Sequence, residues 1–198
     1  MKNEVIVLML ICGLCKSQYL APGNCPRPEV VKNLDLNKFL GKWYEVQKTY
    51  TFFERNLRCV NAEYDNVGNG KIILTRIGMD KDGVSKSIGG RAIVAKLSEP
   101  AKMVIEFETS PSIPVNYWIL DTDYNRYAVV WSCFNMGPFG FFHSEKLWIL
   151  SREKYLTVDL LGAIYKNLSK KGIDWSSLRN INQLDCGISK ENDVAPNI

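Results

Sequence analysis

The stretch Gly41-Lys42-Trp43-Tyr44-Glu45-Val46 opens the first of eight short strand-like runs that occupy most of the chain. Turn signals such as Asn66-Val67-Gly68-Asn69-Gly70 and Asp80-Lys81-Asp82-Gly83 separate the runs, a rhythm typical of a β-barrel or a β-sandwich. No helical crossover lies between them, so consecutive runs are expected to pair antiparallel. The runs lie at approximately 42–51, 58–66, 71–78, 86–96, 102–109, 115–121, 126–133 and 145–151.

A single amphipathic helix is expected after the last run, from Thr157 to Lys171. Thr157 can cap its start, and Gly172 can end it because glycine adopts positive φ without strain. One helix of this kind can bury its apolar stripe only against a sheet, so we place it outside the strands. The stripe consists of Leu160, Leu161, Ile164, Tyr165 and Leu168.

The composition is that of one globular domain with a targeting segment. The chain has 198 residues, 46% of them hydrophobic, and a net charge of +4. This charge is too small and too evenly spread to indicate nucleic-acid binding. No stretch after residue 17 is apolar for long enough to cross a membrane as a helix.

Residues 1–17 resemble a secretory signal peptide, with Lys2 before an apolar run and small side chains at Cys15 and Ser17. We therefore expect a secreted protein whose mature chain begins near Gln18, with one domain over 18–190 and a flexible polar tail over 191–198. Cys12 and Cys15 form a CxxC motif, but they lie in the segment that export removes, so we assign them no redox function.

Four cysteines remain in the predicted mature chain, and their even number is typical of two disulfides in an oxidising compartment. Their wide spacing does not fit a zinc site, which needs closely spaced ligand pairs. Spacing alone leaves three pairings open. The four are Cys25, Cys59, Cys133 and Cys186.

Three short motifs together resemble the lipocalin family. Gly41-Lys42-Trp43 is similar to the family's motif at the first strand, Thr122-Asp123-Tyr124 to its motif between the sixth and seventh strands, and Arg152 to the arginine after the last. Further stretches, including Tyr117-Trp118-Ile119-Leu120 and Trp148-Ile149-Leu150, resemble the branch with apolipoprotein D, Lazarillo and bilin-binding proteins. The resemblance covers nearly the whole mature chain. It implies an all-β fold, an eight-stranded antiparallel up-and-down barrel with the helix packed outside.

The resemblance also implies a closed base and a pair of disulfides. In this topology Trp43, the turn at 122–124 and Arg152 meet at one end of the barrel, with the guanidinium over the indole ring. The branch further implies that Cys25 pairs with Cys133 and that Cys59 pairs with Cys186.

The function that the resemblance implies is transport of a small hydrophobic ligand, such as a lipid, fatty acid, sterol, retinoid or bilin, with no cofactor. Aromatic residues carried over from the branch would line the barrel and contact this ligand. The expected lining residues are Tyr64, Phe107, Tyr117, Trp131 and Trp148.

An apolar segment between the last two runs, 134–142, is expected to form a loop at the open mouth. Its Phe139, Phe141 and Phe142 either narrow the entrance, contact a membrane or lipoprotein surface, or fold back onto the rim. Met136 in the same segment is a possible oxidisable site for a protein that protects against oxidised lipid. The alternative to transport is an interaction or protective protein, in which the barrel is a scaffold and the mouth loops contact a receptor, a membrane or oxidised lipid.

Enzymatic and metal-binding alternatives have little support in the residues. His143 is the only histidine and lacks a nucleophile elbow, and its place at the mouth does not favour haem ligation. The loop from Asp121 lacks the glycine and glutamate of a calcium site. A cysteine-dependent isomerase would need one free thiol. Asn167 is the only N-glycosylation acceptor, and the oligomeric state stays open.

Overall fold

The computed structural model describes residues 20–49, 57–108, 114–137 and 140–186. The predicted signal segment 1–17 and tail 191–198 lie outside these residues. The elements are β1 (Leu20–Pro22), α2 (Leu36–Phe39), β2 (Gly41–Thr49), β3 (Arg58–Gly68), β4 (Lys71–Met79), β5 (Ser85–Val94), β6 (Lys102–Phe107), β7 (Val115–Thr122), β8 (Tyr127–Met136), β9 (Phe142–Ser151), α3 (Val158–Lys170) and β10 (Leu178–Asn180).

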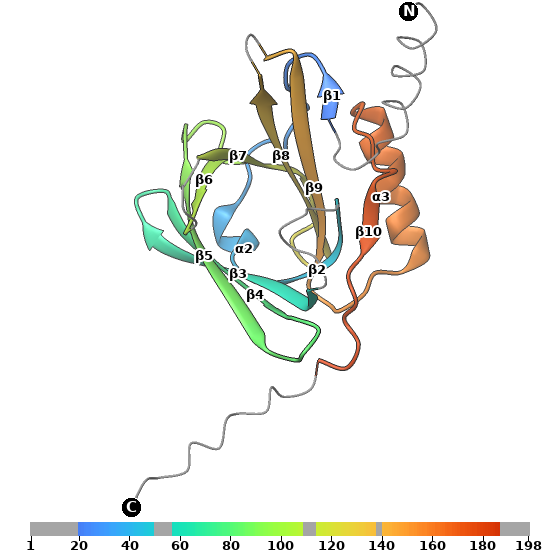
Figure 1. Cartoon of the computed structure of the whole chain (residues 1–198). Helices are drawn as coiled ribbons and strands as arrows, with labels where there is room; N and C mark the ends of the chain where they lie inside the picture. The colour runs from blue at the N-terminus through green and yellow to red at the C-terminus, as the bar shows by residue number, and fades with distance from the viewer. Residues whose placement is uncertain (1–19, 50–56, 109–113, 138–139, 187–198) are drawn as a thin grey trace, which may run out of the picture.

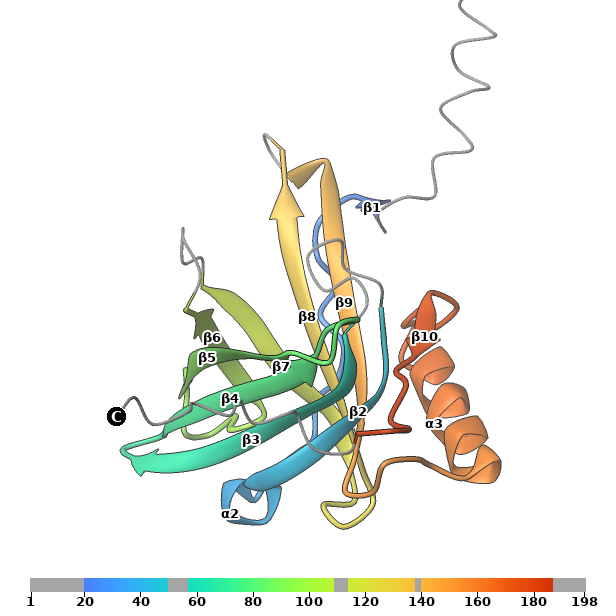
Figure 2. The same cartoon turned by 60° about the horizontal axis from the view of Figure 1, so that its bottom comes forward.

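Strands β2 to β9 form the predicted eight-stranded antiparallel barrel. Each strand pairs with its neighbour along the chain, and β9 also pairs with β2, which closes the sheet on itself. Figure 1 shows the barrel with α3 and β10 beside it, and Figure 2 shows α2 at one end and the β8–β9 hairpin extending at the other. The expectation of a closed barrel is confirmed.

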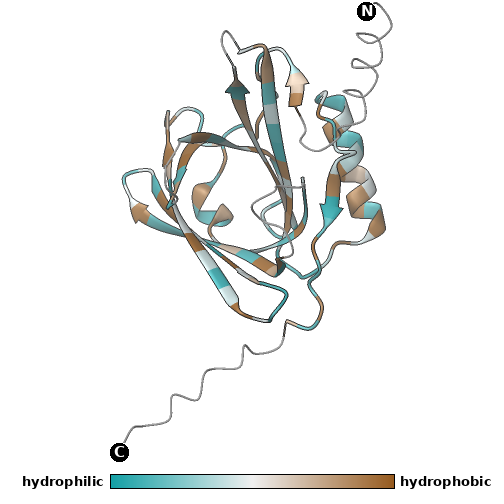
Figure 3. Cartoon of the chain, in the orientation of Figure 1, coloured by the Kyte–Doolittle hydropathy of each residue, from teal (hydrophilic) through white to brown (hydrophobic). Residues whose placement is uncertain are grey.

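Successive side chains along each strand point alternately to the barrel interior and to its outer face. In β4 the side chains of Ile72 and Leu74 are buried in the barrel interior, while the residues between them are partly exposed. Figure 3 shows the resulting change between hydrophobic and hydrophilic residues along the strands. The interior cluster also contains residues from the other strands and from α2, so the barrel end beneath α2 is packed.

The outer face of β8 and β9 packs against α3, as the apolar stripe predicts. Ile164 and Leu168 of the helix are buried in a second apolar cluster with Val129 and Ile149 of the barrel. The Thr157 hydroxyl accepts a hydrogen bond from the Leu160 amide at 3.4 Å, so the predicted cap is confirmed.

The two disulfides join segments outside the barrel to its strands. Cys25 is bonded to Cys133 of β8, and Cys59 of β3 is bonded to Cys186 near the chain's C-terminal end. This is the pairing that the resemblance implies. The bonds close loops of 108 and 127 residues, so each strongly reduces the entropy of the unfolded chain.

Three short elements and one long hairpin differ from the sequence expectation. The strands β1 and β10 and the helix α2 lacked a detectable periodic signal because each spans only three or four residues. The expected mouth loop at 134–142 is shorter than predicted. Its two ends belong to the paired strands β8 and β9, because Met136 lies opposite Phe142 in the ladder.

The Gln183 side chain bridges β2 and β3 at the point where their backbone pairing ends. Its amide nitrogen donates to the carbonyls of Glu45 at 2.9 Å and Val60 at 2.8 Å, beyond the last paired residues of the two strands. The Gln183 side chain is buried, and the disulfide at Cys186 holds this segment in place. The chain after α3 is therefore part of the folded structure.

Candidate functional site

The closed end of the barrel is built around Trp43 and Arg152. The Trp43 side chain is fully buried, and its indole nitrogen donates to the Phe39 carbonyl of α2 at 2.7 Å. The Arg152 guanidinium lies 3.7 Å from the centre of the Trp43 ring, a cation–π contact. These side chains meet where the sequence predicted them to meet.

Arg152 also joins three segments of backbone at this end. It donates to the carbonyls of Tyr124, Lys42 and Leu40 at 3.0, 2.8 and 2.9 Å, and to Lys38 at 2.9 Å. The planar guanidinium suits this role because its five donors point in fixed directions. Partial burial lowers the pKa of Arg152 below its usual value, but arginine remains charged in proteins. Arg152 therefore links α2, the start of β2 and the turn between β7 and β8.

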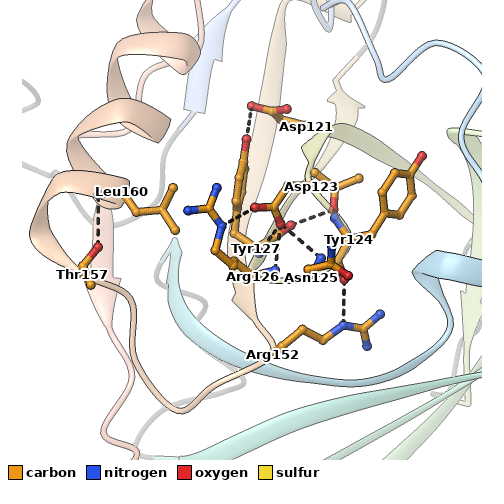
Figure 4. Close-up of polar contacts among 10 residues, drawn as sticks. Asp121, Asp123, Tyr124, Asn125, Arg126, Tyr127, Arg152, Thr157 and Leu160 are labelled. Carbon is orange, nitrogen blue, oxygen red and sulfur yellow. Dashed lines mark hydrogen bonds and ion pairs between the residues drawn. The ribbon is translucent and has the colours of Figure 1, made fainter.

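The turn between β7 and β8 supplies the third part of the base. Asp123 accepts hydrogen bonds from the backbone amides of Arg126 at 2.8 Å and Tyr127 at 3.0 Å, and from the Arg126 side chain at 2.6 Å (Figure 4). Thr122 accepts from the Tyr124 amide at 2.9 Å. Tyr124 has a positive φ of 66°, and its hydroxyl accepts from the Asp35 amide before α2.

Replacing Asp123 with asparagine is expected to destabilise the protein near neutral pH by about 1 kcal/mol, because charge-assisted hydrogen bonds are lost at a site partly open to solvent. Burial raises the pKa of Asp123, but the hydrogen bonds from Arg126 and Tyr127 outweigh it, so this pKa lies below its ordinary value. The stabilisation is therefore complete above the unfolded pKa of about 3.9 and is lost as pH falls through the folded pKa. Urea unfolding of the native protein and the variant at several pH values measures this. The difference between their free energies of unfolding should shrink below about pH 4. If the difference in free energy of unfolding stayed constant down to the pH at which the protein unfolds, the Asp123 carboxylate would not have this stabilising role.

Four of the five predicted lining aromatics share the barrel interior. Tyr64, Tyr117 and Trp148 belong to the interior cluster, and Phe107 packs against it. The hydroxyls of Tyr64 and Tyr117 lie 2.6 Å apart, and the rings of Tyr117 and Trp148 have centres 6.0 Å apart. Burial raises the pKa of Tyr64 well above its usual value, with Tyr117 and Glu45 adding to the shift, so this hydroxyl stays neutral.

The prediction that Trp131 faces the interior is wrong. Trp131 belongs to the outer cluster beneath α3, its ring packs on Trp118, and its indole nitrogen donates to Glu145 at 2.6 Å. The reason is strand alternation. Trp131 shares its face of β8 with Cys133, two residues further on, whose disulfide to Cys25 lies outside the barrel.

A group of buried charges on the interior face was missed in the sequence. Arg76 of β4 and Glu45 of β2 form an ion pair through two hydrogen bonds, and Lys48 lies 4.0 Å from the same carboxylate. All three side chains are at most 10% exposed. Charged residues are almost never buried to this extent unless they are paired, and here Glu45 pairs with both cations.

Exposure differs among the side chains on the interior face of the barrel. Phe39 and Trp43 at the base are 0% exposed, whereas Trp148 retains 8% and Arg76 retains 9%. The closed end therefore has no exposed interior surface, whereas Trp148 and Arg76 keep a small exposed fraction.

The β8–β9 hairpin rises above the barrel (Figure 2), and several of its apolar side chains are exposed. Phe141 is 63% exposed and Phe142 is 52% exposed, with Phe134 and Met136 also on the surface. Phe139 lies outside the described residues. The hairpin thus presents an apolar surface.

His143 and Asn167 both have partners within the fold. The buried His143 ring lies 2.8 Å from the Gly23 carbonyl and 3.1 Å from Glu145, and so joins β9 to the segment after β1. The Asn167 amide of α3 donates to Asp121 of β7 at 2.5 Å. Glycosylation of Asn167 stays a prediction. Within the part of the chain that the structure describes, no three His, Cys, Asp or Glu side chains form a possible metal site.

A groove that the sequence analysis did not predict lies on the outer face of β4, β5 and β6. This groove of about 240 Å³ includes the exposed side chains of Val67, Ile93 and Val104, with Lys71 and Glu106 beside them. Among the described helices, none is long and apolar enough to cross a membrane.

Comparison with known proteins supports the resemblance seen in the motifs. A family model described as "Lipocalin-like domain" matches residues 34–183. The chain is 35% identical to apolipoprotein D of Cavia porcellus over 186 residues, 92% of this chain and 96% of the relative. It is 32% identical to the Lazarillo protein of Schistocerca americana over 152 residues, 74% of this chain and 68% of that protein.

Solved structures agree with this assignment. Insecticyanin from the tobacco hornworm Manduca sexta superposes with a TM-score of 0.73 at 27% identity, covering 88% of this chain and 91% of that one. Lobster apocrustacyanin A1 superposes with a TM-score of 0.71 at 24% identity, covering 85% and 93%, and so supports the fold alone. With its closed eight-stranded barrel, its arginine-capped tryptophan and these relatives, the chain belongs to the lipocalin family.

Proposed function

We propose that this protein is an extracellular carrier that encloses a small hydrophobic ligand in the upper part of its barrel. The observation that supports this most is the contrast between a base without exposed surface and interior side chains near the mouth that keep some. Tyr117 and Trp148 offer apolar ring surface there, and the two tyrosine hydroxyls offer orienting polar atoms. No bond is made or broken in this mechanism.

Retinol binding tests the proposal, because retinol is a small apolar molecule whose binding is measurable through tryptophan fluorescence. Trp148→Ala is expected to weaken retinol binding by about tenfold, because losing roughly 60 Å² of apolar contact costs about 1.4 kcal/mol. Trp118→Ala is the matched control, since Trp118 packs in the cluster outside the barrel. Circular dichroism of both variants reports whether the fold is retained. Equal retinol affinity in both folded variants would contradict interior binding.

A second candidate function rests on the exposed phenylalanines of the β8–β9 hairpin. We propose that they contact a membrane or lipoprotein surface when ligand is loaded or released, because exposed apolar side chains clustered at a loop often mark an interaction site. Replacing Phe139, Phe141 and Phe142 with serine is expected to reduce co-sedimentation with phospholipid liposomes. Unchanged co-sedimentation would remove this function and leave the carrier proposal intact.

Export is supported by two observations. Residues 1–17 have the pattern of a signal peptide, and both disulfides need an oxidising compartment to form and persist. We therefore propose that the chain is secreted after cleavage near Gln18. N-terminal sequencing of the secreted protein checks the cleavage site.

A further inference from the structure

A hydrogen bond crosses the interior of the barrel from one wall to the opposite wall. The hydroxyls of Tyr64 on β3 and Tyr117 on β7 lie 2.6 Å apart, and both side chains are buried. Three strands separate β3 from β7 in either direction around the closed barrel, so the two side chains come from opposite walls. Both belong to the interior cluster. We call Tyr64 and Tyr117 together the tyrosine bar.

The tyrosine bar lies directly on the base of the barrel. The Tyr64 ring contacts the Phe39 ring of α2, with ring centres 5.1 Å apart, and Phe39 contacts Trp43, with ring centres 5.5 Å apart. These three side chains are at most 1% exposed. They therefore have almost no surface that a ligand could contact from within the barrel.

Exposure falls toward the base along two of the strands that reach the tyrosine bar. On the inner face of β7, Val115 is partly buried, Tyr117 is 5% exposed and Ile119 is 0% exposed. On the inner face of β9, Trp148 is 8% exposed and Leu150 is 1% exposed. Both strands run toward the base, which Arg152 joins directly after β9. On these strands the exposed inner surface therefore ends at Tyr117 and Trp148, whose ring centres lie 6.0 Å apart.

We propose that the tyrosine bar is the floor of the ligand compartment and limits how deep an apolar chain can enter. This rests on the carrier function proposed above and selects among its ligands. Deeper entry would separate two hydrogen-bonded hydroxyls in a buried site, which is unfavourable. A compact or short ligand is enclosed above the bar, whereas the excess length of a long straight chain stays in water at the mouth. The bar thus favours compact or short apolar ligands, because extra chain length adds no affinity.

Straight-chain primary alcohols test this depth limit, because members of the series differ only in their number of methylenes. Each methylene that enters the apolar site is expected to raise the affinity about fourfold. For the native protein the affinity should rise along the series and then level off, once the chain reaches the tyrosine bar. Displacement of bound retinol measures the affinity for each alcohol.

Variants of Tyr117 and a matched control identify what sets the limit. Tyr117→Ala removes one half of the bar, so chains longer than the native limit should bind at least about tenfold more tightly than the chain at that limit. Tyr117→Phe keeps the ring and should keep the native limit. Trp118→Ala removes a ring outside the barrel and should also keep it. Circular dichroism reports whether each variant is folded. If Tyr117→Ala does not fold, Tyr117→Leu takes its place with a smaller expected shift.

The outcomes separate the two proposals. If the affinity of the native protein rose through the whole series, or if folded Tyr117→Ala kept the native limit, the floor would be overturned while retinol binding upheld the carrier function. Weakening of all alcohols by one common factor in Tyr117→Ala would also overturn the floor, because a purely structural role predicts that result. Absence of binding by retinol and by every alcohol would overturn the carrier function and the floor with it.

Discussion

Replacing Arg152 with methionine is expected to destabilise the protein by about 2–4 kcal/mol, because the carbonyls at the base would lose their donor together with a cation–π contact. Arg152 bonds the carbonyls of Lys38, Leu40, Lys42 and Tyr124 and lies over Trp43. Water can reach some of these carbonyls after the change, which keeps the expected loss below that of a fully buried site. Urea unfolding at pH 7 measures it.

Two matched variants separate the roles of charge and shape at Arg152. Arg152→Lys keeps the charge but lacks the planar fork, so it should recover only part of the lost stability. Arg126→Met removes an exposed arginine of the neighbouring turn, whose ion pair with Asp123 is open to solvent, and should cost less. If Arg126→Met and Arg152→Met lowered the free energy of unfolding equally, the stability of the base would not depend on the contacts of Arg152.

Replacing Glu45 with glutamine is expected to destabilise the protein by about 3–5 kcal/mol, because Arg76 and Lys48 would then be buried without their carboxylate. Arg76→Met alone should also be strongly destabilising, since it leaves the carboxylate without its bidentate partner. The double variant should cost clearly less than the two single changes together, because both single changes break the same Glu45–Arg76 contact. Urea unfolding of all four proteins measures the coupling.

The control for this cycle is the pair of Glu99 and Lys102. It has the same hydrogen-bonded carboxylate and cation, but its side chains are 41% and 33% exposed. Glu99→Gln should therefore change stability little. Additive effects at Glu45 and Arg76, with no coupling, would show that the pair is not an energetic unit.

The barrel and its base could be predicted from the sequence because their signals are local or depend on the family resemblance. Turn residues mark the strand ends, and the helix stripe at Ile164 and Leu168 needs only a period of 3.6 residues. Trp43 and Arg152 lie far apart in sequence, but the chain order of an up-and-down barrel brings them to the same end.

It was harder to predict whether an individual side chain faces the barrel interior or the outside, because this depends on the register of each strand. Trp131 was assigned to the wrong face. Cys133, two residues later on the same strand, lies on the same face as Trp131, and its disulfide to Cys25 lies outside the barrel, so it could have indicated the correct face. The charged group was missed for a related reason. Lys48 reaches the interior only because of the bulge after Glu45, and a bulge leaves no reliable sequence signal here.

The most direct test of the carrier account is a crystal structure of the protein with retinol bound. The account predicts density for the polyene inside the barrel beside Tyr117 and Trp148. Density confined to the outer groove near Ile93 and Val104, above an interior filled by the protein's own side chains, would contradict it.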